Sequence, residues 1–177
     1  ARAMRLVSRA SAPPAHLLHQ ADFITAKLLG RGGFTDFNNA LKTGFDPVIQ
    51  CWPGWVKDVI NPKLLPEVRA PGSLLGEVDP LCAAQFGLSP QTCVHAGTTD
   101  SIAAFLASAP LEEGAAVTSL GSTLAIKILS PVRIDDPAIG LYSHRLGDLW
   151  LVGGASNTGG AVLKSFFTDA QLAALSH

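Results

Sequence analysis

Two short apolar runs in the second half of the chain, residues 115–120 and 124–129, are separated only by Gly121-Ser122-Thr123. Apolar runs of this length, joined by a short loop that contains glycine, are typical of a β-hairpin. The turn brings together backbone N–H groups and two hydroxyl groups, which can hold a terminal phosphate without a large positive charge. Gly-Ser-Thr is also ordinary hairpin chemistry, so the turn alone leaves both interpretations open.

Composition limits the partners that a chain of this kind can have. Of its 177 residues 47% are hydrophobic and 15% are charged, with a net charge of -1. Such a chain has enough apolar material for a core, and no apolar run approaches the roughly 20 residues of a membrane-spanning helix. No broad basic face is available to a nucleic acid or an anionic membrane. We therefore expect a soluble protein, one domain or a piece of a larger one, that binds small molecules locally; its oligomeric state is not set by these features.

The cysteines and the first 15 residues indicate the cellular compartment of the protein. Cys51, Cys82 and Cys93 form no C-x-x-C pair, which favours a reducing compartment and argues against structural zinc. Residues 1–15 contain three arginines and no acidic residue, a composition compatible with the end of a transit peptide, although the chain does not begin with Met and an internal cut fits equally. The expected location is the cytoplasm, or the plastid stroma in a photosynthetic eukaryote.

Periodicity and breakers predict the elements of the first half. Helices are predicted at residues 15–29, 35–42, 52–60 and 80–86, the last followed by a terminating glycine. Residues 62–76 are dominated by Pro and Gly and predict an irregular surface connection.

Asp100 stands where a predicted strand, residues 93–96, passes through a polar turn into a predicted helix that ends near Pro110. Its carboxylate is expected near the positive end of the helix dipole, where it stays ionised and can accept a proton. Asp100 or its neighbour Thr99 can equally serve only to cap the helix, and the two roles are compatible.

A glycine-rich segment, residues 153–160, follows a predicted strand at residues 150–152 and precedes a predicted helix that runs through Phe167. Its spacing matches neither the dinucleotide-binding nor the P-loop pattern. It also misses the nucleophile elbow of an esterase, so a hydrolase that uses Ser156 with Asp100 and either His95 or His144 is disfavoured. His16 and His19 lie three residues apart on the first predicted helix without the acidic residue that a zinc protease would use, so packing or exposed histidines are the expectation.

Five segments in order resemble the central region of FGGY-family carbohydrate kinases. They are H-Q-A-D-F-I-T-A-K-L-L-G, T-D-F-N-N-A-L-K-T-G-F-D, A-G-T-T-D-S-I-A-A-F, S-L-G-S-T-L-A-I-K and G-G-A-S-N-T-G-G-A-V-L. Within the family the chain is most similar to the plant and cyanobacterial branch described as D-ribulose kinases, some of them named xylulose kinase-like.

The resemblance implies an α/β fold of the two-lobed actin and hexokinase type, with ribonuclease H-like mixed sheets flanked by helices. Residues 1–110 would be the end of the sugar lobe and residues 111–177 the first part of the nucleotide lobe. FGGY kinases are about two to three times as long, so the chain resembles a fragment that is expected to be inactive alone. Residues 153–160 are expected to shape the wall of the cleft.

The resemblance also implies roles for individual residues. Asp100 would be the catalytic base, with Asp100 and Thr99 at the substrate, and Gly121, Ser122 and Thr123 would bind the ATP phosphates. Asp36 and Asn38 would be structural residues near the sugar site. Magnesium would act with ATP, with its main ligand expected on an N-terminal segment that this sequence lacks.

Three functions remain open at this stage. The leading one is ATP-dependent phosphorylation of a ketopentose, D-ribulose above D-xylulose or another polyol, at a primary hydroxyl. The second is an actin-like nucleotide-binding module without sugar chemistry, against which Asp100 weighs. The third is the disfavoured Ser156 hydrolase.

Overall fold

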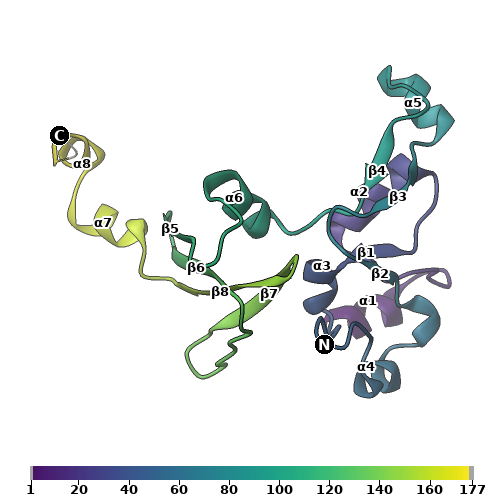
Figure 1. Ribbon diagram of the computed structural model, residues 1–177, viewed down its shortest axis with the longest axis horizontal. Coiled ribbons are helices and arrows are strands. Elements are labelled where there is room, and N and C mark those ends of the chain that lie inside the picture. The colour runs from purple at the N-terminus through teal and green to yellow at the C-terminus, as the bar shows by residue number, and fades with distance from the viewer. Residues whose placement is uncertain (1, 176–177) are drawn as a thin grey trace. The chain divides into compact units, whose positions relative to one another are not determined.

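The computed structural model describes residues 2–175 and divides into two compact units, Ala1–Ile102 and Ala103–His177, which are treated separately (Figure 1). The resemblance places a change of lobe near residue 110; the division between the compact units falls inside helix α6 (Asp100–Ser108).

The first unit alternates short helices with two small sheets. Its remaining helices are α1 (Arg2–Arg9), α2 (Gln20–Leu29), α3 (Phe37–Leu41), α4 (Gly54–Val59), the 3-10 helix η1 (Pro62–Leu64) and α5 (Pro80–Phe86). Its strands are β1 (Phe34–Asp36), β2 (Glu67–Arg69), β3 (Leu74–Glu77) and β4 (Cys93–His95). Strand β1 pairs with β2 in parallel, and β3 pairs with β4 antiparallel.

Helix α2 starts at Gln20, so the predicted start at residue 15 was wrong, and so was the placement of His16 and His19 on this helix. The carboxylate of Asp22 accepts a hydrogen bond from the His19 N–H at 2.9 Å and fixes the first turn there. Upstream, the Leu17 N–H donates instead to the carbonyl of Leu64 at 2.8 Å. The apolar spacing before residue 20 therefore reflects packing against another segment. Gly30, at φ 68°, ends the helix, so the predicted end at residue 29 is confirmed.

The prediction of an irregular connection at residues 62–76 was wrong, because this segment contains η1, β2 and the start of β3. Phe34 lies opposite Glu67 in the parallel pair, and the Glu67 N–H donates to the Gly33 carbonyl at 2.7 Å. These partners are distant in sequence, so the local Pro and Gly content carried no sign of the pairing.

Two apolar clusters stabilise the first unit. One contains Leu29, Leu75 and Ala96, with Val94 of β4 packed against them, and so joins α2 to both strands of the β3–β4 pair. The other contains Val56, Ile60 and Leu64, with Leu17 packed against them. The first cluster bears on the site, because Ala96 directly follows β4 in the segment that leads to Asp100.

The second unit contains a four-stranded antiparallel sheet of order β5-β6-β8-β7. The strands are β5 (Ala116–Leu120), β6 (Leu124–Ser130), β7 (Tyr142–Leu146) and β8 (Leu149–Ser156), and helices α7 (Gly160–Phe166) and α8 (Asp169–Leu175) follow (Figure 1). Leu120 lies opposite Leu124, which confirms the predicted hairpin around Gly121-Ser122-Thr123.

Strand β8 is longer than the predicted strand at residues 150–152, since the first half of the predicted glycine-rich loop belongs to it. Gly153 and Gly154 pair with Lys127 and Ile126 of β6. A Cβ on Gly153 would lie 2.7 Å from the carbonyl oxygen of Ile126, so glycine here permits a close approach of two backbones rather than a turn.

Candidate active site

Asp100 is the first residue of α6, and the predicted order of strand, polar turn and helix is confirmed. The Thr99 carbonyl accepts the N–H of Ile102 at 3.1 Å, which starts the helix. The Asp100 side chain is exposed, and its Oδ1 accepts the N–H of Ser101 at 2.7 Å. One carboxylate oxygen thus contacts the first turn of the helix, and the exposed group can accept a proton from a bound hydroxyl.

Thr99 lies in the same turn but is buried, and its Oγ1 has no hydrogen-bond partner among the described residues. The Thr99 hydroxyl therefore does not cap α6, which was one of the two roles considered for the Thr99–Asp100 pair. A buried hydroxyl without a partner is uncommon in a folded protein.

Asp36 is a buried N-cap of α3. Its Oδ1 accepts the N–H groups of Asn38 at 2.8 Å and Asn39 at 3.1 Å, and its Oδ2 accepts the Asn39 side-chain amide at 2.6 Å. Three donors occupy this carboxylate, so its chemistry in the structure is that of a cap, in line with the structural role expected of it.

Asn38 connects α3 to the turn before Asp100. Its Nδ2 donates to the Oγ1 of Thr98 at 3.0 Å, across 60 residues of sequence. Sequence reasoning did not single out Thr98, because two adjacent threonines offer the same chemistry until their burial and partners are known. The sequence signal that could have pointed to Thr98 is the pair of threonines directly before the candidate base.

Asp22, in α2, is a second buried carboxylate of this unit. Burial raises the pKa of Asp22 above its ordinary value of 3.8, and the hydrogen bond from the His19 N–H opposes this increase. The negative charge of Asp36 acts in the same direction as burial. Asp22 is therefore more easily protonated than a surface aspartate.

In the second unit, the Gly121-Ser122-Thr123 turn is exposed at the end of the β5–β6 hairpin. The Gly121 N–H donates to the Thr123 carbonyl at 3.0 Å, so this N–H is engaged within the turn and is not among the donors offered to a ligand. The exposed hydroxyl groups of Ser122 and Thr123 are the side-chain donors of the turn.

The end of the glycine-rich segment packs directly on this turn. The Gly160 N–H donates to the Gly121 carbonyl at 2.7 Å, and a Cβ on Gly159 would lie 2.6 Å from the backbone nitrogen of Leu124. Sequence reasoning placed this segment at a cleft wall but missed its contact with the hairpin. The sequence signal for this contact was the pair Gly159-Gly160, since adjacent glycines allow a second backbone to approach closely.

The hydrolase arrangement with His144 does not form. Ser156 pairs with Leu124, whereas His144 pairs with Leu151, five residues earlier on β8. At about 3.3 Å per residue this separation is roughly 16 Å along the strand, far beyond a hydrogen bond. The Ser156 hydroxyl accepts instead the N–H of Thr158 at 3.1 Å.

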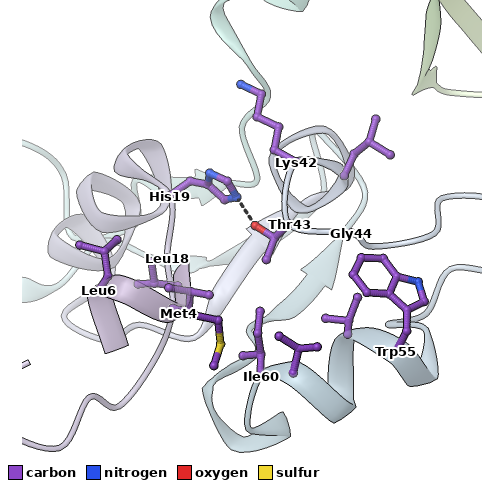
Figure 2. Close-up of a pocket in the computed structure, with 13 residues that line it drawn as sticks. Met4, Leu6, Leu18, His19, Lys42, Thr43, Gly44, Trp55 and Ile60 are labelled. Atoms are coloured by element: carbon purple, nitrogen blue, oxygen red, sulfur yellow. Dashed lines mark hydrogen bonds between the residues drawn. The ribbon is translucent and has the colours of Figure 1, made fainter. Parts of the chain in front are cut away.

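A cavity of about 670 Å³ in the first unit holds none of the predicted site residues. Figure 2 shows it between α1, the segment just before α2, the end of α3 and α4, with a mostly apolar lining. Its polar groups include Lys42 and a 3.0 Å hydrogen bond between His19 Nε2 and Thr43 Oγ1 (Figure 2). Its volume alone does not make it the site of phosphoryl transfer, which needs a base and phosphate donors.

Within residues 2–175, no three His, Cys, Asp or Glu side chains gather in a way that could hold a metal ion. None of the helices in that range is both long enough and apolar enough to cross a bilayer.

No family model matches the sequence. Solved structures do match it. Xylulose kinase from Rhodospirillum rubrum superposes with a TM-score of 0.82 at 25% identity, over 93% of this chain and 35% of that one. The chain has the fold of a segment of a carbohydrate kinase. This confirms the expected α/β class, since sheets and helices together superpose on part of an actin-like sugar kinase. The expectation of mixed sheets is not met among the described residues, where each sheet is either wholly parallel or wholly antiparallel.

Two more carbohydrate kinases match across the same extent. Gluconate kinase from Lactobacillus acidophilus has a TM-score of 0.78 at 18% identity over 95% of this chain, and Plasmodium falciparum glycerol kinase with ADP has 0.75 at 17% over 93%. The chain spans 35% to 36% of the length of these three kinases.

Proposed function

We propose that this chain is part of an FGGY-family kinase of the D-ribulose kinase branch, which transfers the γ-phosphoryl group of ATP to a primary hydroxyl of a ketopentose. The superposition on a xylulose kinase, at a TM-score of 0.82 over 93% of the chain, carries the proposal. The exposed carboxylate at the start of α6 and the exposed Gly-Ser-Thr turn of the β5–β6 hairpin support it. The carboxylate supplies a base and the turn supplies phosphate donors. A nucleotide-binding module without sugar chemistry would need the phosphate donors but not the base.

Asp100 is the general base in this proposal. The substrate hydroxyl gives its proton to the Asp100 carboxylate as the hydroxyl oxygen bonds to the γ-phosphorus. The bond between that phosphorus and the oxygen that bridges it to the β-phosphate breaks, and ADP leaves with the electron pair. Thr99 is assigned to the substrate beside Asp100; its Oγ1 is buried and has no partner among the described residues, so the turn must uncover this hydroxyl before it can bond to the sugar.

Ser122 and Thr123 hold the phosphates. Their exposed hydroxyl groups donate to phosphate oxygens, and hydrogen bonds to a charged acceptor are stronger than neutral ones. Gly121 contributes the shape of the turn, since its N–H is bonded to Thr123. Magnesium bound with ATP would neutralise phosphate charge, and residues 2–175 contain no cluster of three metal-ligating side chains that would hold it.

The identity of the sugar is tested by a panel. The complete natural protein that contains this sequence is assayed for ATP consumption with D-ribulose, D-xylulose, L-ribulose, gluconate and glycerol. We expect the highest kcat/KM with D-ribulose. A preference for D-xylulose, gluconate or glycerol would support a carbohydrate kinase but refute the assignment to the D-ribulose kinase branch. These substrates are included because the matched structures are xylulose, gluconate and glycerol kinases. ATP hydrolysis that no polyol accelerates would overturn the kinase proposal.

The role of Asp100 is tested with Asp100→Asn in the same protein. We expect kcat to fall at least 100-fold, the lower end for loss of a positioned base, with ATP binding unchanged. Asp169→Asn is the matched control, because Asp169 is also an exposed aspartate that begins a helix. Full activity in Asp100→Asn would refute the assignment of the base.

A further inference from the structure

The hydrogen bond between Asn38 and Thr98 fixes the turn that presents Asp100. Asn38 is only 1% exposed, its Nδ2 lies 3.0 Å from Thr98 Oγ1, and Thr98 precedes Asp100 by two residues. The bond joins two segments of the first unit that are 60 residues apart in sequence. The bond is partly shielded from water, and a bond between such distant segments sets their relative position in a way that local contacts cannot.

Asn38 is itself held in place from the other side. Asp36 accepts the Asn38 N–H at 2.8 Å and the Asn39 N–H at 3.1 Å, so the first turn of α3 is fixed by a buried carboxylate. The Asn38 side chain therefore starts from a backbone with little freedom. Its Nδ2 is committed to Thr98, and its Oδ1 has no partner among the described residues.

The turn is anchored before and after Thr98 by backbone bonds. Before it, the Ala96 N–H donates to the Ser73 carbonyl and the Ala96 carbonyl accepts the Gly72 N–H, both at 2.8 Å. After it, the Thr99 carbonyl starts α6. Thr98 is the residue between these anchors whose side chain is bonded to another segment, so its hydroxyl sets the direction in which α6, and Asp100 with it, leaves the turn.

We propose that Asn38 is a positioning residue for Asp100 and acts through the hydroxyl of Thr98. The inference rests on the proposed function, because it gives Asn38 the role of orienting the Asp100 carboxylate, the proposed base. A base that is displaced by about 1 Å from its substrate can lose about 100-fold in rate, so the bond matters for turnover beyond its effect on stability.

The test uses Thr98→Val and Thr98→Ser in the complete natural protein, with kcat, KM for sugar and ATP, and Tm measured for each. Valine keeps the shape of threonine and removes the hydroxyl, and serine keeps the hydroxyl. We expect Thr98→Val to lower kcat about 10- to 100-fold with KM values within about threefold, and Thr98→Ser to restore kcat to within about threefold of the wild type. Thr92→Val is the matched control, because Thr92 is also a half-buried threonine of the first unit and lies outside the turn.

Asp100→Asn separates the two ways in which the test can fail. If Asp100→Asn is inactive while Thr98→Val matches Thr92→Val, the positioning role is wrong and the proposed function stands. If Asp100→Asn is fully active, the proposed base is wrong. Equal loss of kcat in Thr98→Val and Thr98→Ser would also refute the role of the hydroxyl. Should Thr98→Val not fold, Thr98→Ala removes the same hydroxyl without placing a methyl group against Asn38 Nδ2, and the same outcomes apply to it.

Discussion

The backbone N–H of Gly160 donates a hydrogen bond to the carbonyl oxygen of Gly121 at 2.7 Å, and so ties the first turn of α7 to the tip of the β5–β6 hairpin. Within the second unit, the proposed phosphate turn is thus supported by a segment almost 40 residues further along the chain. A Cβ on Gly160 would lie 2.8 Å from the Gly121 carbonyl oxygen, so this approach depends on glycine.

Gly159 is the position where that requirement can be tested. A Cβ there would lie 2.6 Å from Leu124 N and 2.7 Å from Thr123 Cα, so alanine must push α7 and the hairpin apart. We expect Gly159→Ala to lower the free energy of unfolding of the 177-residue chain by about 1 to 3 kcal/mol, the usual cost of overpacking. Urea denaturation measures it. Gly54→Ala is the control, because a Cβ on Gly54 would meet nothing within 4 Å; equal effects of the two substitutions would contradict the prediction.

Ser122 and Thr123 should act on ATP rather than on the sugar. Each hydroxyl that donates to a phosphate oxygen contributes about 1.5 to 3 kcal/mol, so Ser122→Ala and Thr123→Ala are each expected to raise the Kd for ATP about 10- to 150-fold. Titration calorimetry on the complete natural protein checks this, with KM for the sugar as a second readout. Ser119→Ala, an exposed serine on the adjoining strand β5, should bind ATP as the wild type does. Unchanged ATP affinity in both turn variants would remove this turn from the phosphate site.

Asp36 should contribute more stability than an ordinary helix cap. It accepts three hydrogen bonds in a buried place, and its loss leaves buried donors of Asn38 and Asn39 unpaired. We expect Asp36→Ala to cost about 2 to 4 kcal/mol. Asp79→Ala removes the cap of α5, where the carboxylate accepts only the Leu81 and Cys82 N–H groups, and should cost about 1 kcal/mol. A larger loss from Asp79→Ala than from Asp36→Ala would show that the network at α3 adds nothing.

Asp22 should make the stability depend on pH in an unusual direction. Because burial raises its pKa in the folded chain, the folded state binds more protons than the unfolded state between the ordinary value of 3.8 and the raised pKa. Stability due to this group is therefore highest below 3.8 and is lost as the pH rises through the folded pKa. In Asp22→Asn the amide oxygen can still accept the His19 N–H, but the titration is gone. The free energy of unfolding of Asp22→Asn minus that of the wild type should grow as the pH rises, then level off. A difference that shrinks with rising pH would contradict this sign.

Local signals predicted the elements whose cause is local. Helix α5 begins at Pro80 and stops at Gly87, as its sequence predicts, because Asp79 and Gly87 cap it within the same segment. The β5–β6 hairpin and the strand and helix around Asp100 follow from runs and breakers that are adjacent in sequence.

The failures have long-range causes. Strand β2 forms because β1 lies beside it, and its own residues did not distinguish it from a loop. The start of α2 was misplaced because Leu17 fits a helical pattern while its N–H is bonded to Leu64. At the site, Asp100 and the Gly121-Ser122-Thr123 turn could be selected as candidates from residue type and spacing. The supports of these two features, Thr98 and Gly160, depend on partners far along the chain.

The separation between Asn38 and Thr98 also has a consequence for biosynthesis. At about 5 to 20 residues per second, the ribosome adds Thr98 some 3 to 12 seconds after Asn38, because 60 residues separate them. Until then the amide of Asn38, which ends almost fully buried, has only water to bond with. The Asn38–Thr98 bond can therefore form only after β2, β3 and β4 have been made, so the turn before Asp100 is fixed late in synthesis of the first unit.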